Sequence, residues 1–143
     1  MMHRRAALAG LLVAVVTAAR AAEPTLEAAV RAWAAGATPR DGRVRLEIAE
    51  LVENGNAVPL TVRVDSPMTA ADHVVEIALF NQRNPQRDIA RFTLGPASGR
   101  AEVSVRIRLA TSQQIVALAR LSDGSVWQQR VDILVTLAAC VEG

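Results

Sequence analysis

The feature that most constrains this chain is a strict alternation of apolar and polar residues that recurs from residue 44 onward. In the clearest case, residues 103–109 read VSVRIRL. A period of two places the apolar side chains on one face of an extended strand, whereas a helix needs a period near 3.6. A chain built mainly from such segments must pair them into sheets and bury their apolar faces against one another.

Seven segments of this kind are predicted to be strands. Turn-forming pairs separate them, among them Asn54-Gly55, Asn84-Pro85 and Asp123-Gly124. This spacing is typical of an antiparallel sandwich, so we predict an all-β, immunoglobulin-like antiparallel β-sandwich of about seven strands with a short N-terminal helix. The strands are expected at residues 44–48, 60–64, 75–79, 90–94, 103–109, 115–121 and 126–135.

The expected helix precedes the first strand. Residues 23–35 are mostly helix formers, and Leu26, Val30 and Trp33 recur at the spacing of one helix face. The Ala-Gly-Ala-Thr-Pro run that ends at Pro39 should terminate it. Near the start of the last strand, Trp127 is expected to pack in the core, because buried aromatic residues usually do.

The first residues have the organisation of an export signal. Arg4 and Arg5 precede an apolar stretch, and an Ala-Arg-Ala sequence ends at Ala21. We therefore predict a signal peptide over residues 1–21, a partial match to the twin-arginine type, and one sandwich domain over residues 22–143. The predicted location is the periplasm, without stable membrane insertion after cleavage.

Composition excludes several function classes. All 16 basic residues are Arg, which excludes a Schiff-base lysine and a P-loop lysine. Aromatic residues make up only 3% of the chain, too few for a surface that binds single-stranded nucleic acid by stacking on its bases. Two histidines are too few for a histidine-rich metal site. Removal of residues 1–21 leaves 13 arginines against 14 acidic residues, so the mature chain lacks the positive charge that binds nucleic acid or anionic lipid.

Other candidate side chains have simpler interpretations. His73 has no histidine, serine or paired carboxylate around it at a catalytic spacing, so it is expected at the surface or as a cap. A row of outward arginines is typical of a solvated sheet face and also of an interface with a partner subunit, and the sequence leaves both open. These arginines are Arg43, Arg45, Arg63, Arg106 and Arg108.

The single cysteine, Cys140, lies beyond the last expected strand and three residues before the final residue. In an oxidising compartment it is a reactive thiol, the partner of another chain's cysteine, or a buried apolar residue. Ala138 and Ala139 form a small-residue stalk that carries it about 10 Å beyond Leu137, at roughly 3.3 Å per residue. The nearby Glu142 disfavours the thiolate, so activation would have to come from a partner.

Several short motifs, in order along the chain, resemble the Y subunit of the periplasmic Sox thiosulfate-oxidising system, a family of sulfur carriers. The resemblance covers most of the chain that follows the signal segment, and it includes the near-terminal Cys140 and the twin arginine. The motifs are Val52–Pro59, Ile77–Pro85, Arg91–Pro96, Arg106–Ala110 and Leu121–Gly124.

The resemblance implies a carrier rather than an enzyme. Thiosulfate-derived sulfur would be attached covalently to Cys140, with no other cofactor and no metal. A Z-type subunit would complete a heterodimer, and the sulfur-oxidising enzymes of the system would act on the adduct. This family surrounds its cysteine with glycines, whereas here Ala138 and Ala139 precede it, and alanine gives the backbone less freedom.

Two other classes of protein fit the residues. One is an exported structural or adhesive sandwich whose Cys140 forms a disulfide with another chain. The other is an accessory protein that lends its thiol transiently to a redox enzyme.

Overall fold

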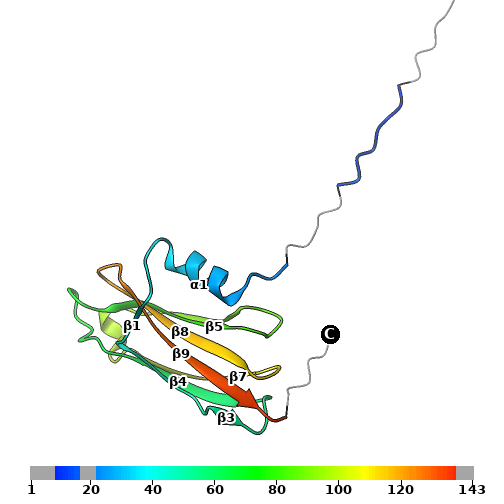
Figure 1. Cartoon of the computed structure of the whole chain (residues 1–143). Coiled ribbons are helices and arrows are strands. Elements are labelled where there is room, and N and C mark those ends of the chain that lie inside the picture. Colours follow the sequence, from blue (N-terminus) through cyan, green and yellow to red (C-terminus); the bar gives the residue numbers. More distant parts are fainter. Residues whose placement is uncertain (1–8, 17–21, 138–143) are drawn as a thin grey trace, which may run out of the picture.

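Two β-sheets pack face to face, and one helix lies on the outer face of the larger sheet (Figure 1). The computed structural model describes residues 9–16 and 22–137. The helix is α1 (Leu26–Ala34), and a short 3₁₀ turn covers Pro96–Ser98. The strands are β1 (Arg40–Asp41), β2 (Val44–Glu47), β3 (Leu51–Val52), β4 (Val58–Val64), β5 (Val74–Asn81), β6 (Asp88–Thr93), β7 (Glu102–Ile107), β8 (Gln113–Leu121) and β9 (Val126–Val135).

The larger sheet has six strands and the smaller one three. The order in the larger sheet is β1-β9-β8-β5-β6, and β3 also pairs with β9. The smaller sheet has the order β2-β4-β7. All pairs are antiparallel except those of β1 and β3 with β9, which are parallel. The immunoglobulin-like sandwich and all seven predicted strands are confirmed.

The alternation in β4 reflects a sheet with one buried face. Val58, Leu60, Val62 and Val64 point into the sandwich, and Arg63 points to solvent. In β5, by contrast, five consecutive residues are buried, Ile77 to Asn81. Alternate residues of β5 face the smaller sheet, and the others face α1, so both faces are covered.

The helix begins and ends at recognisable caps. The Thr25 hydroxyl accepts a hydrogen bond from the Ala28 N–H at 3.2 Å, which satisfies one of the free donors of the first turn. At the other end, Ala35 is left-handed and Gly36 has a φ of 93°, a conformation that glycine adopts without strain. The predicted helix is thus confirmed, with a start at Leu26 because Thr25 is its cap.

The buried face of α1 closes a second apolar cluster. Leu26, Val30 and Trp33 pack against side chains of the larger sheet, including Phe80 and Leu118. At the edge of this cluster, the Glu27 carboxylate pairs with the Arg130 guanidinium of β9, which holds the pKa of Glu27 below its ordinary value. The helix is therefore fixed to the sheet by apolar packing and by charge.

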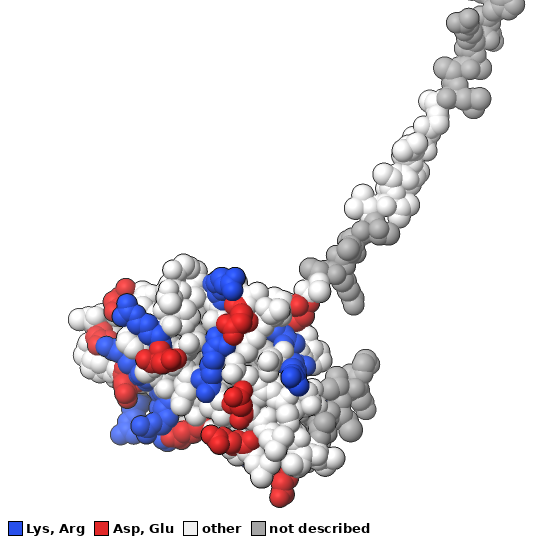
Figure 2. All heavy atoms as spheres, in the orientation of Figure 1, with Lys and Arg blue, Asp and Glu red and all other residues white. Residues whose placement is uncertain are grey.

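The outward arginines lie where the alternation places them. All five of those named above are exposed, and Arg63 bridges Glu47 at 2.5 Å and Glu102 at 3.2 Å. Figure 2 shows basic and acidic side chains interspersed over the visible face rather than gathered by sign. Surface ion pairs of this kind contribute little to stability, and their mixture gives the face no strong single-sign field.

Residues 9–16 form no helix or strand, and they extend away from the sandwich (Figure 1). Leu12 in this segment is 95% exposed. Within the described residues, no helix is both long and apolar enough to span a membrane.

Candidate functional site

The residue with the strongest chemical interest, Cys140, lies outside the described residues, as do its neighbours Ala138, Ala139 and Glu142. The structure does describe the chain up to Leu137. The segment that would carry the thiol therefore has a defined starting point, which we call the base of the arm, formed by Thr136, Leu137 and the residues bonded to them.

Backbone hydrogen bonds hold this base to the segment that lies beside the end of β9. The Leu134 N–H donates to the Glu50 carbonyl at 2.8 Å, and the Thr136 N–H donates to the Val52 carbonyl at 2.9 Å. One residue further on, the Gly55 N–H donates to the Leu137 carbonyl at 3.0 Å. The last described residues are thus tied to the segment 50–55 rather than projecting freely from the sheet.

The segment that holds the base is itself ordered by a turn. The Asn54 side chain accepts a hydrogen bond from the Asn56 N–H at 2.9 Å, which is an Asx turn. The Gly55 carbonyl accepts from the Leu109 N–H at 2.8 Å, which connects this turn to the segment just after β7. These residues belong to the first of the motifs that carry the family resemblance, so this motif supports the base of the arm.

Three exposed leucines lie at or beside the base of the arm. Leu51 and Leu134 are directly opposite each other in the β3–β9 pair, and both point outward. They are 60% and 58% exposed, and Leu137 is 61% exposed. Among the described residues of the sandwich, these three are the exposed large apolar side chains, and they lie at one end of β9.

A shallow hollow of about 460 Å³, lined mostly by polar residues, lies next to Leu134. Glu50, Asp132, Gln114 and Arg83 are among its lining residues. Gln114 donates a hydrogen bond to Asp132 at 3.2 Å across β8 and β9.

The loop on the far side of the hollow is held by buried amides. The Asn84 side-chain oxygen accepts from the Ala110 N–H at 2.9 Å and from the buried Gln113 amide at 2.7 Å. The buried Asn81 amide donates to the Gln86 carbonyl at 2.6 Å. The second resemblance motif, which contains Asn81 and Asn84, thus fixes the rim of the hollow.

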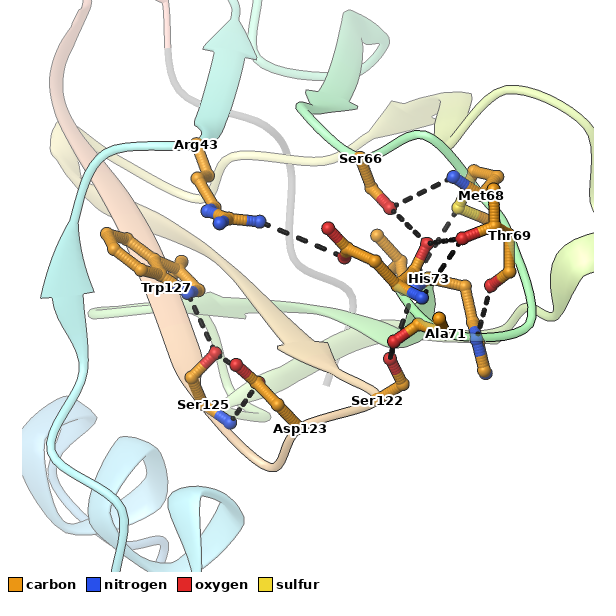
Figure 3. Close-up of polar contacts among 12 residues, drawn as sticks. Arg43, Ser66, Met68, Thr69, Ala71, His73, Ser122, Asp123, Ser125 and Trp127 are labelled. Atoms are coloured by element: carbon orange, nitrogen blue, oxygen red, sulfur yellow. Dashed lines mark hydrogen bonds and ion pairs between the residues drawn. The ribbon is translucent and has the colours of Figure 1, made fainter.

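His73 lies at the opposite end of the sandwich, in a loop cluster (Figure 3). Its ring Nδ1 is 2.9 Å from the Thr69 carbonyl oxygen, and its backbone N–H donates to the Ser122 hydroxyl at 3.1 Å. Asp72, the nearest carboxylate in sequence, interacts with Arg43 at 4.0 Å instead. The prediction that His73 is a surface or capping residue is confirmed by these backbone contacts.

Trp127 forms the other part of this cluster. It is partly buried against the core, and the guanidinium groups of Arg43 and Arg40 lie 5.2 and 5.8 Å from its ring centre. Its indole N–H donates to the Ser125 hydroxyl at 3.0 Å, which in turn donates to Asp123 (Figure 3). The two Ser125 hydrogen bonds hold the pKa of Asp123 below its ordinary value. Trp127 therefore packs against the core as a partly buried residue, with two arginines beside its ring, and the cluster stabilises the 121–125 hairpin.

In the part of the chain that the structure describes, no three His, Cys, Asp or Glu side chains gather closely enough to hold a metal ion.

Sequence reasoning did not find the elements that hold the base of the arm. The β3 strand has two residues, too few to show an alternation, and its pairing with β9 is non-local. The Asn54-Gly55 pair was a usable signal, but it predicts a turn and not what the turn binds.

Solved structures with a similar fold include two kinds of protein. The sulfur carrier protein SoxY from Chlorobium limicola f thiosulfatophilum is 24% identical, with a TM-score of 0.66 over 79% of this chain and 97% of that one. A superoxide reductase (neelaredoxin) from Ignicoccus hospitalis is 22% identical, with a TM-score of 0.59 over 66% of this chain and 80% of that one. A superoxide reductase from Nanoarchaeum equitans is 13% identical, with a TM-score of 0.57 over 67% of this chain and 100% of that one. At these identities the likeness shows a shared sandwich fold.

Sequence comparison distinguishes between them. No curated protein sequence matches the chain significantly. The family model described as sulfur oxidation protein SoxY, however, matches residues 13–140, a range that contains the base of the arm and extends to Cys140. The family supports a sulfur-carrier role in the Sox system, and the chain belongs to the SoxY family.

Proposed function

We propose that this protein carries thiosulfate-derived sulfur as a covalent adduct of Cys140 and presents it to the sulfur-oxidising enzymes of the Sox system. The observation that carries the proposal is the match of the SoxY family model up to residue 140, beyond the fixed base at Leu137. The base supplies a rigid origin for a short thiol-bearing segment. The sandwich supplies the fold and the docking surface, and it acts as a carrier rather than as an enzyme.

The attachment step is an oxidation. The Cys140 thiol and thiosulfate form a new S–S bond, and they release one proton and two electrons to a redox partner. Water then attacks the terminal sulfur of the adduct, and the products are sulfate, two protons and a persulfide anion on Cys140. A thiol attacks as the thiolate, and Glu142 disfavours that form, so the enzyme that receives the arm must supply the positive charge.

The alternative uses of Cys140 differ in accessibility. In a carrier, the thiol of the native protein should react with a small maleimide at the rate of a free cysteine, and reaction in denaturant should be no faster. A cysteine buried against the sandwich would be labelled slowly in the native state only, which contradicts the proposal. An intermolecular disulfide would appear as a dimer that reductant dissolves, and it would favour the structural or adhesive module instead.

A Z-type subunit is proposed as the permanent partner. In the part of the chain that the structure describes, β7 is an edge strand of the smaller sheet that pairs with β4 alone, and the outward face of this sheet carries exposed arginines such as Arg45 and Arg106. Free edges and arginine-rich faces are surfaces that partners cover. On co-expression, light scattering should give the summed mass of one copy of each subunit. A monomer in the presence of the Z-type protein would contradict this part of the proposal.

Export to the periplasm is proposed from the first 21 residues. The described part of that segment, residues 9–16, makes no element of the sandwich, and its apolar side chains are exposed. Removal of residues 9–16 together with the rest of the signal segment would therefore take no helix or strand from the described sandwich. The mature chain is expected to begin at Ala22.

A further inference from the structure

The distance between the thiol and the sandwich has a strict upper limit. Cys140 is the third residue after Leu137, so their Cα atoms cannot be more than about 10 Å apart. Leu137 itself is fixed through its carbonyl to Gly55. An enzyme that reacts with Cys140 must therefore bring its surface within about one side chain's length of the base of the arm. Whatever lies around that base becomes part of the contact.

We propose that Leu51, Leu134 and Leu137, together with the hollow beside Leu134, form the docking surface for the enzyme that exchanges sulfur with Cys140. The proposal rests on the carrier function given above and adds the surface that the partner enzyme recognises. The occupant is a protein with an apolar rim around the entrance to its active site. Its rim covers the leucines when the arm enters.

The placement of these leucines supports docking rather than folding. Leu51 and Leu134 lie on the same outer face of the larger sheet that α1 covers elsewhere, but the helix packs on Phe80, Val116 and Leu118 and leaves this end open. Each leucine remains more than half exposed, although the alternation of β9 places polar residues at most other outward positions. Exposed apolar side chains gathered at one place mark a contact surface.

The size of the patch favours a transient occupant. A stable protein pair buries about 800 Å² on each side, and three leucines beside a shallow hollow supply only a fraction of that area. A second copy of this chain or a permanent subunit would need a larger apolar surface than the described residues offer here. A carrier has to leave each enzyme after the reaction, and a small apolar contact that forms and breaks is suited to that requirement.

The test is Leu134→Arg in the full mature chain, with the purified thiosulfate-coupling enzyme of the Sox system as the probe. Position 134 faces outward, and Glu50 and Asp132 line the same hollow, so an arginine there has acidic neighbours and should not disturb folding. We expect KM for the carrier to rise by about tenfold, the loss of one apolar anchor, with kcat within about twofold. Leu134→Met should behave as the parent does.

Two controls separate docking from other effects. Ala97→Arg adds the same charge at an exposed position of the 3₁₀ turn, at the other end of the sandwich, and should leave KM unchanged. The reaction of Cys140 with a small maleimide should proceed at the same rate in all variants, because that reagent needs no docking surface.

Three results would overturn the proposal. An unchanged KM in Leu134→Arg would show that the enzyme does not use this surface, while adduct formation on Cys140 would leave the carrier function intact. Loss of the Z-type subunit from Leu134→Arg, measured by light scattering, would place the leucines in the permanent interface instead. If the parent protein itself acquires no adduct, the carrier function fails, and the docking surface fails with it.

Discussion

Trp33→Ala is expected to lower the free energy of unfolding by about 3–5 kcal/mol, the range typical of a large aromatic residue deleted from a core. Trp33 is only 6% exposed, and it fills the space between α1 and the larger sheet beside Phe80 and Leu118. Its ring lies 4.1 Å from the Arg120 guanidinium, and its indole N–H donates to a Glu76 carboxylate oxygen at 2.6 Å. The alanine variant loses all three interactions at once. Urea denaturation followed by circular dichroism measures the change.

Trp33→Phe keeps the prediction testable even if the alanine variant does not fold. Phenylalanine retains most of the apolar contact and the position under Arg120, but it cannot donate to Glu76, so a loss of roughly 1–2 kcal/mol is expected. Trp127→Phe is the matched control, because the Trp127 N–H bonds to Ser125 at the exposed hairpin, and the effect there should be smaller. An alanine variant of Trp33 within about 1 kcal/mol of the parent protein would show that α1 is not part of the cooperative core.

The sequence was most informative where a strand has one buried face. In β4 and β7 the alternation marks strands of the smaller sheet, whose outer face is not covered by the helix. In β5 the buried run from Ile77 to Asn81 carries no alternation of its own, because α1 covers the second face. The helix could be predicted from the spacing of Leu26, Val30 and Trp33. Its position on the sheet could not, since that depends on non-local packing.

The residues of the candidate site could be identified from the sequence, but their surroundings could not. A lone cysteine behind two alanines could be identified from the sequence, and so could the family motifs. The function of the Val52–Pro59 motif became apparent only when Gly55 was found to bond to Leu137, 82 positions away in the chain. The exposure of Leu51 and Leu134 was equally hidden, because a leucine in an alternating strand is ordinarily assigned to the core.

The second large effect is expected at the thiol itself. Cys140→Ser should abolish every thiosulfate-derived mass adduct, because a serine hydroxyl cannot form the S–S bond on which the cycle depends. Folding should remain unchanged, since a carrier thiol lies outside the core, and substitutions outside the core usually change stability by less than about 0.5 kcal/mol. Mass spectrometry after incubation with thiosulfate and the Sox enzymes measures the first effect, and urea denaturation measures the second.

If Cys140 is instead an apolar core residue, the reverse pattern is expected. Its replacement by serine would bury a hydroxyl without a partner and cost about 1 kcal/mol or more. The adduct would be absent from the parent protein as well as from the variant. The two measurements on this one substitution therefore distinguish a carrier thiol from a structural one.

The most direct test of the carrier function is the intact mass of the mature protein, purified from thiosulfate-grown cells and measured with and without reductant. We predict a chain that begins at Ala22, partly loaded with sulfur species that reductant removes, and an unloaded chain for Cys140→Ser purified in the same way. A parent protein whose mass is that of the bare chain before and after reduction would contradict the carrier function.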